Sequence, residues 1–408
     1  MRILQVCKKF PFPIKDGEGV AVRALARGLR EAGCTVDLLS FNTSKHYVKD
    51  PQSANLPHYN SIASSELDND VVWHQAALSM CKPGSYHVSR FECEEFRIQL
   101  KTLLQLNDYD AVVLETSILS IYIPTIRKHS SATVVMRAHN LEHEIWSRIG
   151  KGGNVFLRPA YRIFARRLKR FEQKWVNEID LLLPITARDG EQFVEDLGYT
   201  GKAHVVPVGY EVDDRRLRDR VPLDELPFAI SFIGSLDWAP NQEGLKWFLA
   251  SVWPKLHEEF PTLQFHIAGR KTPPEITNLN LPKVVVHGEV DDSARFLQRY
   301  PMTVAPILSG SGTRVKILDA MVSGRVVLTT DMGLEGIEAR DREEVLICRS
   351  PSAFVDQVRY ARDNPRDVVA IGKRARRFIE EHFDFARIGF GVASQIRDVR
   401  RRTLVAQG

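Results

Sequence analysis

The sequence has few cysteines, no long apolar run and little excess charge. Its 408 residues include five cysteines, which are scattered and form no Cys-x-x-Cys pair. This pattern indicates neither a disulfide framework nor a zinc site, and it favours a reducing compartment. No apolar run comes near the length of about 18 residues that a membrane-spanning helix needs. The net charge of +5 suits an anionic ligand or membrane surface, but it is well below that of a nucleic-acid binder.

We expect neither a targeting segment at the start of the sequence nor a low-complexity segment within it. The apolar stretch at residues 2–7 is too short for a signal peptide, and Lys8 and Lys9 follow at once. A hydrophobic content of 44% is typical of an ordinary globular protein. We therefore expect a folded cytoplasmic protein, either free or peripheral at the inner face of the membrane.

What the chain does contain is an alternation of strand and helix patterns. Residues 2–7 are typical of a buried strand, and apolar residues at helical spacing predict a helix over residues 19–32. A strand, a helix and a strand in succession favour a parallel sheet. Residues 44–90 have weaker periodicity and predict an irregular excursion between strands. Further strands are predicted in the first half at residues 35–39, 111–114, 132–136 and 181–183.

A second series of strands and helices follows Pro227. Such a series predicts a second parallel sheet, and ligands bind at the carboxyl ends of the strands in such folds. The fold class is therefore α/β, with two Rossmann-like doubly wound domains facing a central cleft. The strands of the second series are predicted at residues 228–234, 263–269, 284–286, 303–306 and 326–329.

The segment between the two series has the composition of a linker. It holds Pro207, Gly209 and Pro222 together with a run of charges. The predicted organisation is a first domain at 1–205, a linker at 206–226, a second domain at 227–385 and a helix at 386–408 that packs back on the first domain.

The strongest chemical signal follows the strand that ends at Pro306. Gly310 and Gly312 allow backbone N–H groups to approach a ligand, and the helix predicted after them points its positive end at an anion. Arg314 and Lys316 add two cations at the same place, which suits a diphosphate. On spacing alone, a turn before a solvated basic helix remains the alternative.

The segment from Gly312 to Val327, followed by Gly333-Leu334-Glu335-Gly336, resembles the donor-site signature of glycosyltransferase family 4. The resemblance covers most of the chain, because Gly17-Glu18-Gly19 and Arg137-Ala138-His139-Asn140 match in the first half. It implies the GT-B fold (the two-domain glycosyltransferase fold), retention of anomeric configuration, and no metal or other cofactor. A nucleoside diphosphate sugar would bind the second domain, and the first domain would lie on the acceptor side.

The acidic positions of the signature depart from the family. The family usually has two glutamates eight positions apart, where this chain has Ser311 and Asp319. Asp319 is expected to accept hydrogen bonds from ribose hydroxyls, whereas Ser311 leaves the contacts to the donor sugar open.

The basic positions depart as well. Many members of the family carry an arginine and a lysine after the first strand of the second domain, where this chain has Ser235 and Asn241. Arg270, Arg314 and Lys316 are then expected to carry the positive charge that faces the diphosphate.

His139 resembles the family histidine that lies near the donor sugar. It follows a predicted strand, and its expected role is hydrogen bonding to the sugar or to the transition state. Gly17 and Gly19 either let the loop after the first strand approach the diphosphate or acceptor, or merely turn the chain into a helix. They do not fit a dinucleotide fingerprint, because position 22 is a valine.

Two patterns that could indicate a metal are interpreted otherwise. His139 and His143 have helical spacing, but no third ligand is evident. Asp68-Asn69-Asp70 looks like the metal-binding Asp-x-Asp of another glycosyltransferase fold, yet it follows no predicted strand. It is interpreted as a solvated loop.

Residues 158–175 predict a basic amphipathic helix. Its aromatic and apolar side chains form one stripe and its arginines another. The apolar stripe either packs on the first domain, leaving the charges solvated, or rests on an anionic membrane that would carry a lipid-linked acceptor.

The resulting hypothesis is a transfer of sugar from a nucleoside diphosphate sugar to a glycan or lipid-linked acceptor. The alternatives are a nonhydrolysing sugar-nucleotide epimerase and a non-catalytic subunit that binds a sugar nucleotide or glycan. No metal and no nucleic acid are expected as partners. The predicted catalytic residues are His139, Arg314 and Lys316. The predicted substrate-binding residues are Gly17, Gly19, Gly234, Ser235, Arg270, Gly310, Ser311, Gly312, Thr313, Asp319 and Glu335.

Overall fold

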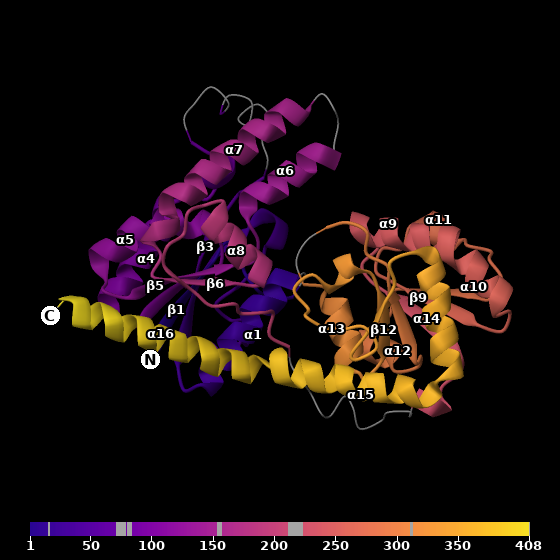
Figure 1. Ribbon diagram of the computed structural model, residues 1–408. Coiled ribbons are helices and arrows are strands. Elements are labelled where there is room, and N and C mark those ends of the chain that lie inside the picture. Colours follow the sequence, from indigo (N-terminus) through magenta and orange to yellow (C-terminus); the bar gives the residue numbers. More distant parts are fainter. Residues whose placement is uncertain are drawn as a thin grey trace. The chain divides into compact units, whose positions relative to one another are not determined.

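The computed structural model forms two compact units, each built around its own sheet (Figure 1). The N-terminal unit comprises Met1–Gly209 and Phe385–Gly408, and the C-terminal unit comprises Tyr210–Asp384. The structure describes residues 1–14, 17–70, 79, 84–152, 157–210, 223–310 and 313–407.

The division between the units falls inside the segment expected to be a linker. Val206 and Val208, at the start of that segment, are buried in the N-terminal unit. Leu223, near its end, packs against the core of the C-terminal unit. Residues 211–222 lie outside the described part of the chain.

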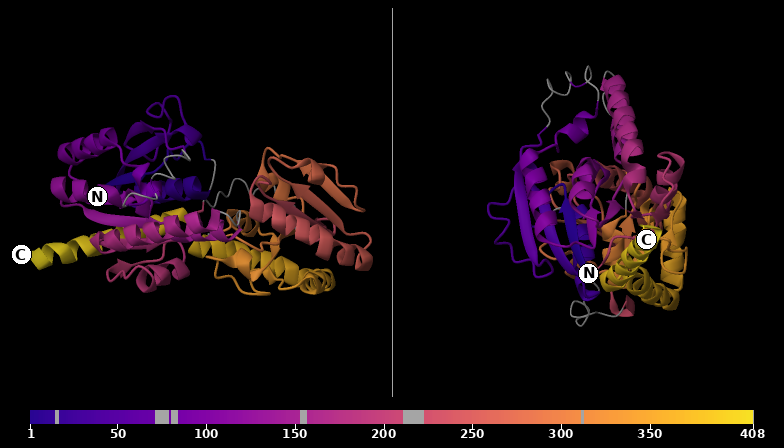
Figure 2. Two further views of the ribbon diagram at one scale, coloured as in Figure 1. Left: turned by 90° about the horizontal axis from the view of Figure 1, so that it is seen from above. Right: turned by 90° about the vertical axis from the view of Figure 1, so that its left-hand side faces the viewer.

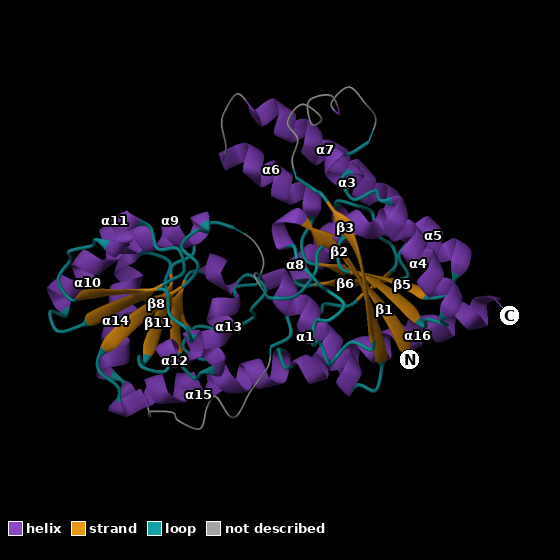
Figure 3. Ribbon diagram, turned by 180° about the vertical axis from the view of Figure 1, so that it is seen from behind, coloured by secondary structure: helices purple, strands orange, loops and turns teal. Residues whose placement is uncertain are grey.

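The described strands of the N-terminal unit form a seven-stranded parallel sheet with the order β3-β2-β1-β4-β5-β6-β7. Helices cover both faces of the sheet (Figure 3). An apolar core lies against each face, and the strand sequences are therefore continuous hydrophobic runs. The strand order reverses between β1 and β4, which is the switch point where such folds bind ligands. The strands are β1 Arg2–Cys7, β2 Thr35–Thr43, β3 Ser61–Leu67, β4 Ala111–Leu114, β5 Thr133–Ala138, β6 Leu181–Pro184 and β7 Lys202–Ala203.

The edge strand β3 corrects the prediction of an irregular excursion at residues 44–90. It pairs in parallel with β2 through seven residues, and Asp68 follows it directly. Its sequence, Ser-Ile-Ala-Ser-Ser-Glu-Leu, is short of large apolar residues because an edge strand buries less surface, so periodicity did not reveal it. Asp68-Asn69-Asp70 therefore does follow a strand. Asp68 accepts a hydrogen bond from the Asp70 amide, as in a solvent-facing turn.

Helices α6 (Glu142–Gly152) and α7 (Arg158–Trp175) run side by side and project beyond the sheet (Figures 1 and 3). The Trp146 ring of α6 packs against Tyr161 and Phe164 of α7, and Leu168 is fully buried. The first part of the apolar stripe of the basic helix is thus used for packing inside the unit, as in the first of the two alternatives above.

The C-terminal helix α16 lies along the N-terminal unit beside α1 (Figure 2). Its Val392, Ala393 and Ile396 join the same core as Val22 and Leu25 of α1. The helices of this unit are α1 Gly17–Glu31, η1 Ser44–His46, α3 Tyr86–Ser89, α4 Glu94–Leu106, η2 Ser117–Tyr122, α5 Ile123–His129, α6 Glu142–Gly152, α7 Arg158–Trp175, η4 Val176–Glu178, α8 Ala187–Glu195 and α16 Phe385–Gln407.

The C-terminal unit repeats the design with a six-stranded parallel sheet in the order β10-β9-β8-β11-β12-β13. Its switch point lies between β8 and β11. The predicted α/β class with two doubly wound sheets is therefore confirmed. The strands are β8 Ala229–Ile233, β9 Gln264–Ala268, β10 Val284–Gly288, β11 Met302–Ala305, β12 Val326–Thr329 and β13 Leu346–Ile347.

Helices again cover both faces of this sheet (Figure 3). In the described part of the unit, a short π-helical stretch, η7, joins α9 to α10. The helices are η6 Leu223–Glu225, α9 Ala239–Trp247, η7 Phe248–Val252, α10 Trp253–Glu259, α11 Pro274–Thr277, α12 Ser293–Leu297, α13 Val315–Val322, η8 Asp331–Leu334, α14 Pro351–Asp363 and α15 Pro365–His382.

Candidate functional site

The switch point of the C-terminal sheet gathers most of the predicted binding residues of that unit. The loop from β8 to α9 and the loop from β11 to α13 both leave the carboxyl ends of neighbouring strands. Gly310, in the second loop, has φ 95° and lies against Trp238 and Pro240 of the first, so a side chain there would be strained and crowded. Ser311 and Gly312 lie outside the described residues.

Lys316 lies in the first turn of α13, and its ammonium group is held by neutral groups. Its Nζ donates to Asn241 Oδ1 at 2.8 Å and lies 4.6 Å from the centre of the Phe232 ring. In the described part of the chain no carboxylate pairs with this half-buried lysine. Burial lowers the pKa of Lys316 to about 7, and the charge of Arg314 acts in the same direction. An anion placed here would restore the charge.

Arg314 immediately precedes α13 and is almost fully buried. Its guanidinium lies 3.6 Å from a Glu335 carboxylate oxygen and 5.7 Å from the Trp238 ring centre. Glu335 therefore lies beside Arg314, the predicted phosphate-binding arginine, although the two residues are distant in sequence. Thr313 Oγ1 beside them is buried, and the described residues offer it no hydrogen-bond partner.

Ser235 and Arg270 meet at the ends of the neighbouring strands β8 and β9. Arg270 Nε and Nη2 donate to Ser235 Oγ at 3.3 and 3.2 Å, and that hydroxyl donates to Asp237 at 2.6 Å. Gly234 precedes them, where an added Cβ would lie 2.9 Å from Asn241 Nδ2. The structure thus brings the exposed Arg270 to the position where the family usually has its own arginine.

Asp319 lies one turn along α13, where its carboxylate accepts a hydrogen bond from the Tyr210 hydroxyl. Sequence reasoning did not single out Tyr210, because it lies in the segment expected to be a linker. The predicted role of Asp319 toward a ribose remains a prediction.

In the N-terminal unit, His139 follows β5 and is hydrogen-bonded to a buried carboxylate. Its Nε2 lies 2.7 Å from Glu115 Oε2, and Glu115 is fully buried at the carboxyl end of β4. Burial alone would raise the pKa of Glu115, but the His139 hydrogen bond and the Arg137 charge outweigh it and hold this pKa below its usual value. An ionised carboxylate only accepts, so Nε2 carries the proton and donates it. Nδ1 is then the ring atom left to face a ligand.

Glu115 itself is held by Gln5 of β1. Gln5 Nε2 donates to the second Glu115 oxygen and to the Val22 carbonyl of α1, and Gln5 Oε1 accepts from the Tyr59 hydroxyl at 2.8 Å. Three neighbouring strands thus share one buried network at the switch point. Glu115 was not predicted from the sequence, although a carboxylate directly after a fully apolar strand was a signal that could have indicated it.

A second carboxylate network lies beside the first. Glu142, at the start of α6, accepts hydrogen bonds from Lys8 at 3.2 Å and Thr116 at 2.9 Å. Although burial opposes its charge, Lys8 and His87 hold the pKa of Glu142 well below its usual range. Lys8 also pairs with Glu18, which lies between the predicted binding residues Gly17 and Gly19 at the start of α1. The loops after β1 and β5 are therefore tied together.

His143 is held by another partner and does not act with His139. Its Nδ1 lies 2.7 Å from Glu172 of α7, and Glu172 also accepts from Ser117 and from the Glu142 amide. Among the described residues no cluster of three histidines, cysteines or acids is placed to hold a metal ion. Within the same residues, no helix has the length and apolar character needed to cross a membrane.

The C-terminal unit matches a known family. Residues 227–364 match the family model described as glycosyl transferases group 1. The match covers most of the C-terminal unit, which is therefore similar to the glycosyl transferases group 1 family. A relative from Klebsiella pneumoniae, described as an uncharacterized 44.6 kDa protein in the cps region, is 22% identical over 406 residues, which is 95% of this chain and 97% of the relative.

Solved glycosyltransferase structures share the fold of the whole chain. Sucrose-phosphate synthase of Thermosynechococcus elongatus aligns with a TM-score of 0.68 at 15% identity over 100% of both chains. TarM aligns with a TM-score of 0.67 at 10% identity over 98% of both. HepE of Anabaena, solved with UDP-glucose, aligns with a TM-score of 0.61 at 13% identity over 98% of this chain and 100% of HepE. The C-terminal unit is thus part of a chain with the GT-B fold.

Proposed function

We propose that this glycosyltransferase moves a sugar from a nucleoside diphosphate sugar to a hydroxyl of a glycan or lipid-linked acceptor, with retention of configuration. The observation that carries the proposal is Lys316, a half-buried cation at a helix N-terminus whose hydrogen-bond partner is a neutral amide. A diphosphate supplies the missing negative charge, and the helix dipole favours the same ligand. HepE, which shares the fold, was solved with UDP-glucose.

In this proposal the C-terminal unit stabilises the leaving group. Lys316, Arg314 and Arg270 face the diphosphate as its charge develops, which is electrostatic catalysis by groups already in place. Retention is proposed to follow from front-face attack, in which the leaving phosphate oxygen takes the proton of the acceptor hydroxyl. Thr313 Oγ1, buried without a partner among the described residues, would donate a hydrogen bond to a phosphate oxygen.

We propose that His139 forms a hydrogen bond with the donor sugar. Glu115 accepts the hydrogen bond of His139 Nε2 and fixes the ring, so Nδ1 is the nitrogen that would meet a sugar hydroxyl. We place the reaction in the cytoplasm and in polysaccharide biosynthesis, in agreement with the relative described in a cps region.

The test is binding and turnover with a panel of nucleoside diphosphate sugars, beginning with UDP-glucose. Thermal shift identifies the donor, because a ligand that binds the folded state raises the melting temperature. Lys316→Ala should weaken donor binding about 30-fold, the range expected when one charge-assisted contact to a phosphate is lost. Lys373→Ala removes an exposed lysine from α15 of the same unit and should leave the affinity unchanged. Donor binding by Lys316→Ala that equals the wild type would contradict the proposal.

The products separate the alternatives. A transferase releases nucleoside diphosphate in the presence of acceptor, whereas an epimerase yields a second sugar nucleotide without one. A binding subunit would show tight donor binding with no product for any acceptor. His139→Ala should lose turnover while it keeps most of the donor affinity, which the diphosphate contacts of the C-terminal unit supply. A loss of turnover of this kind is expected only of an enzyme.

A further inference from the structure

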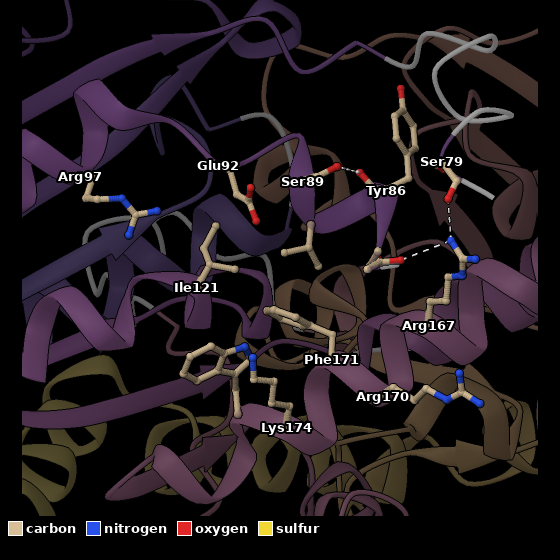
Figure 4. A pocket seen from close by; sticks show the side chains of 14 residues that line it. Ser79, Tyr86, Ser89, Glu92, Arg97, Ile121, Arg167, Arg170, Phe171 and Lys174 are labelled. Carbon is tan, nitrogen blue, oxygen red and sulfur yellow. Dashed lines mark hydrogen bonds between the residues drawn. The ribbon is translucent and has the colours of Figure 1, made fainter. Parts of the chain in front are cut away.

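A cavity of about 840 Å³ lies in the N-terminal unit between α7, α3 and η2 (Figure 4). This volume is within the range of about 300–1,000 Å³ that is usual for small-molecule sites. We call it the α7 pocket and define it by Tyr86, Ile121, Arg170, Phe171, Lys174 and Trp175. It lies on the other side of α7 from Glu172, whose buried side chain contacts the His139 side of the unit.

One wall of the pocket is apolar. The Phe171 ring projects into its centre, with Ile121 beside it (Figure 4). Trp175 also lines the pocket. Phe171 and Trp175 are only half-buried, although both belong to the apolar stripe of α7. The apolar stripe therefore packs on α6 near the start of α7, and it lines the pocket near the end of α7.

The charged residues that line the pocket are mostly basic: Arg97, Arg167, Arg170 and Lys174 against Glu92. Arg170 and Lys174, which we call the basic rim, are exposed and one helical turn apart, and no acid among the described residues pairs with either. They end a ladder of four exposed cations, Arg162, Arg166, Arg170 and Lys174, spaced by four residues. Like charges at this spacing repel one another, so the ladder opposes helix formation unless an anion neutralises it.

The far end of the same helix pair exposes aliphatic surface. Ile149 in the last turn of α6, Leu157 just before α7 and Ile163 in its second turn are 44%, 43% and 38% exposed. Aliphatic side chains next to a basic ladder are typical of a surface that meets a lipid with an anionic headgroup.

We propose that the α7 pocket binds a phosphate ester carried on an apolar chain, with the phosphate on Arg170 and Lys174 and the chain against Phe171 and Trp175. The apolar wall and the basic rim each match one half of such a lipid phosphate. A free phosphate would meet the rim alone, and a neutral lipid would meet the wall alone. This inference concerns a site in the N-terminal unit and stands independently of the proposed sugar transfer.

The experiment measures binding of decyl phosphate by calorimetry, below the concentration at which it forms micelles. Inorganic phosphate and decanol are the two half-ligands, and decyl phosphate should bind at least about tenfold more tightly than either, a difference of about 1.4 kcal/mol. Equal affinity for decyl phosphate and inorganic phosphate would overturn the proposal, because the apolar wall would then contribute nothing.

Variants locate the site. Arg170→Gln with Lys174→Gln should weaken decyl phosphate binding about tenfold or more, since both cations are removed from an exposed rim without disturbing the core. Lys45→Gln with Lys49→Gln removes two exposed lysines at the same spacing in the same unit and should have no effect. If both double variants bind alike, or if UDP displaces decyl phosphate from the wild type, the ligand sits elsewhere and the assignment fails.

Discussion

At the switch point of the N-terminal sheet a buried carboxylate binds a histidine, whereas at that of the C-terminal sheet Lys316 and Arg270 bind neutral groups. Glu115, His139 and Gln5 are buried and joined into a single hydrogen-bonded network. Lys316 and Arg270 are instead hydrogen-bonded to the neutral groups of Asn241 and Ser235. The two sheets have the same strand order up to their last strands, so the fold does not impose this difference.

The comparison separates two kinds of preorganisation. A closed network holds one imidazole in a single orientation and tautomer, which suits a group that must be positioned. Cations without a carboxylate partner have no acid that competes with an incoming ligand, which suits the binding of an anion. In the proposed reaction the N-terminal unit positions the His139 imidazole, and the cations of the C-terminal unit neutralise the charge of the diphosphate.

The largest expected effect comes from weakening the closed network. Glu115→Gln keeps the shape but can donate as well as accept, so it no longer dictates which His139 nitrogen carries the proton. We expect turnover to fall about 100-fold, the lower end of what a positioned proton-transfer or hydrogen-bonding group contributes. Donor affinity should change less than about twofold, because Glu115 lies in the other unit from the proposed diphosphate site. Steady-state turnover and calorimetric donor affinity measure the two effects.

Glu172→Gln is the comparison variant for this prediction. It alters the other buried glutamate–histidine pair, also 2.7 Å apart, through the same change of charge. We expect a similar loss of thermal stability and a much smaller loss of turnover. Equal losses of turnover in both variants would mean that Glu115 acts only through folding.

The next effect comes from making the C-terminal site resemble the N-terminal one. Asn241→Asp places a carboxylate at the Lys316 ammonium, where the amide oxygen now lies at 2.8 Å. The lysine becomes paired and a negative charge faces the diphosphate, so donor affinity should fall about tenfold or more. Calorimetry with UDP-glucose, or with the donor that the panel identifies, measures it.

Two controls isolate the charge. Asn278→Asp adds the same charge at an exposed position of the same unit and should be neutral. Asn241→Ala removes both hydrogen bonds of the amide and adds no charge. If it weakens binding as much as Asn241→Asp does, the loss of the hydrogen bonds and not the new charge explains the effect.

The smallest effect is a pH dependence of the wild type. The pKa of Lys316 is lowered to about 7 by burial and by Arg314, and a bound diphosphate would raise it. Binding then takes up a proton above pH 7, so affinity is fully present below pH 7 and falls as pH rises beyond it. A sugar nucleotide has no titrating phosphate in this range, and about tenfold should be lost between pH 6 and pH 8. A flat profile would mean that Lys316 does not contact the diphosphate.

Asn241→Asp sharpens this last prediction. The new carboxylate should return the Lys316 pKa toward its ordinary value, and the fall in affinity above pH 7 should then disappear. Calorimetry of the variant across the same pH range provides the check.

Much of the fold could be predicted because burial on both faces makes parallel strands readable as apolar runs. The bounds predicted for β4, β12 and α7 are those observed. The strand β3 was missed because an edge strand with serines and an alanine carries little hydrophobic signal. The short strands β7 and β13 were missed as well, since each has only two residues.

The candidate site also has residues that could be predicted from the sequence and residues that could not. The glycine turn with Arg314 and Lys316 was predictable, because a phosphate site on a loop and helix start is local in sequence. Glu115 and Glu172 were not predicted, because each acts through a histidine 24 or 29 residues away. The contact of Tyr210 with Asp319 spans 109 residues and has no local pattern at all.

The sequence by itself determined the α/β class, the positions of most core elements and the place where an anion would meet a helix N-terminus, because these depend on local periodicity and on backbone geometry. Only the tertiary structure decided which polar groups are satisfied. It paired His139 with Glu115, left Lys316 with a neutral amide, and opened the α7 pocket beside a helix whose apolar stripe is elsewhere packed. Partners of this kind come from different strands and helices, and burial rather than sequence spacing sets their charge and pKa.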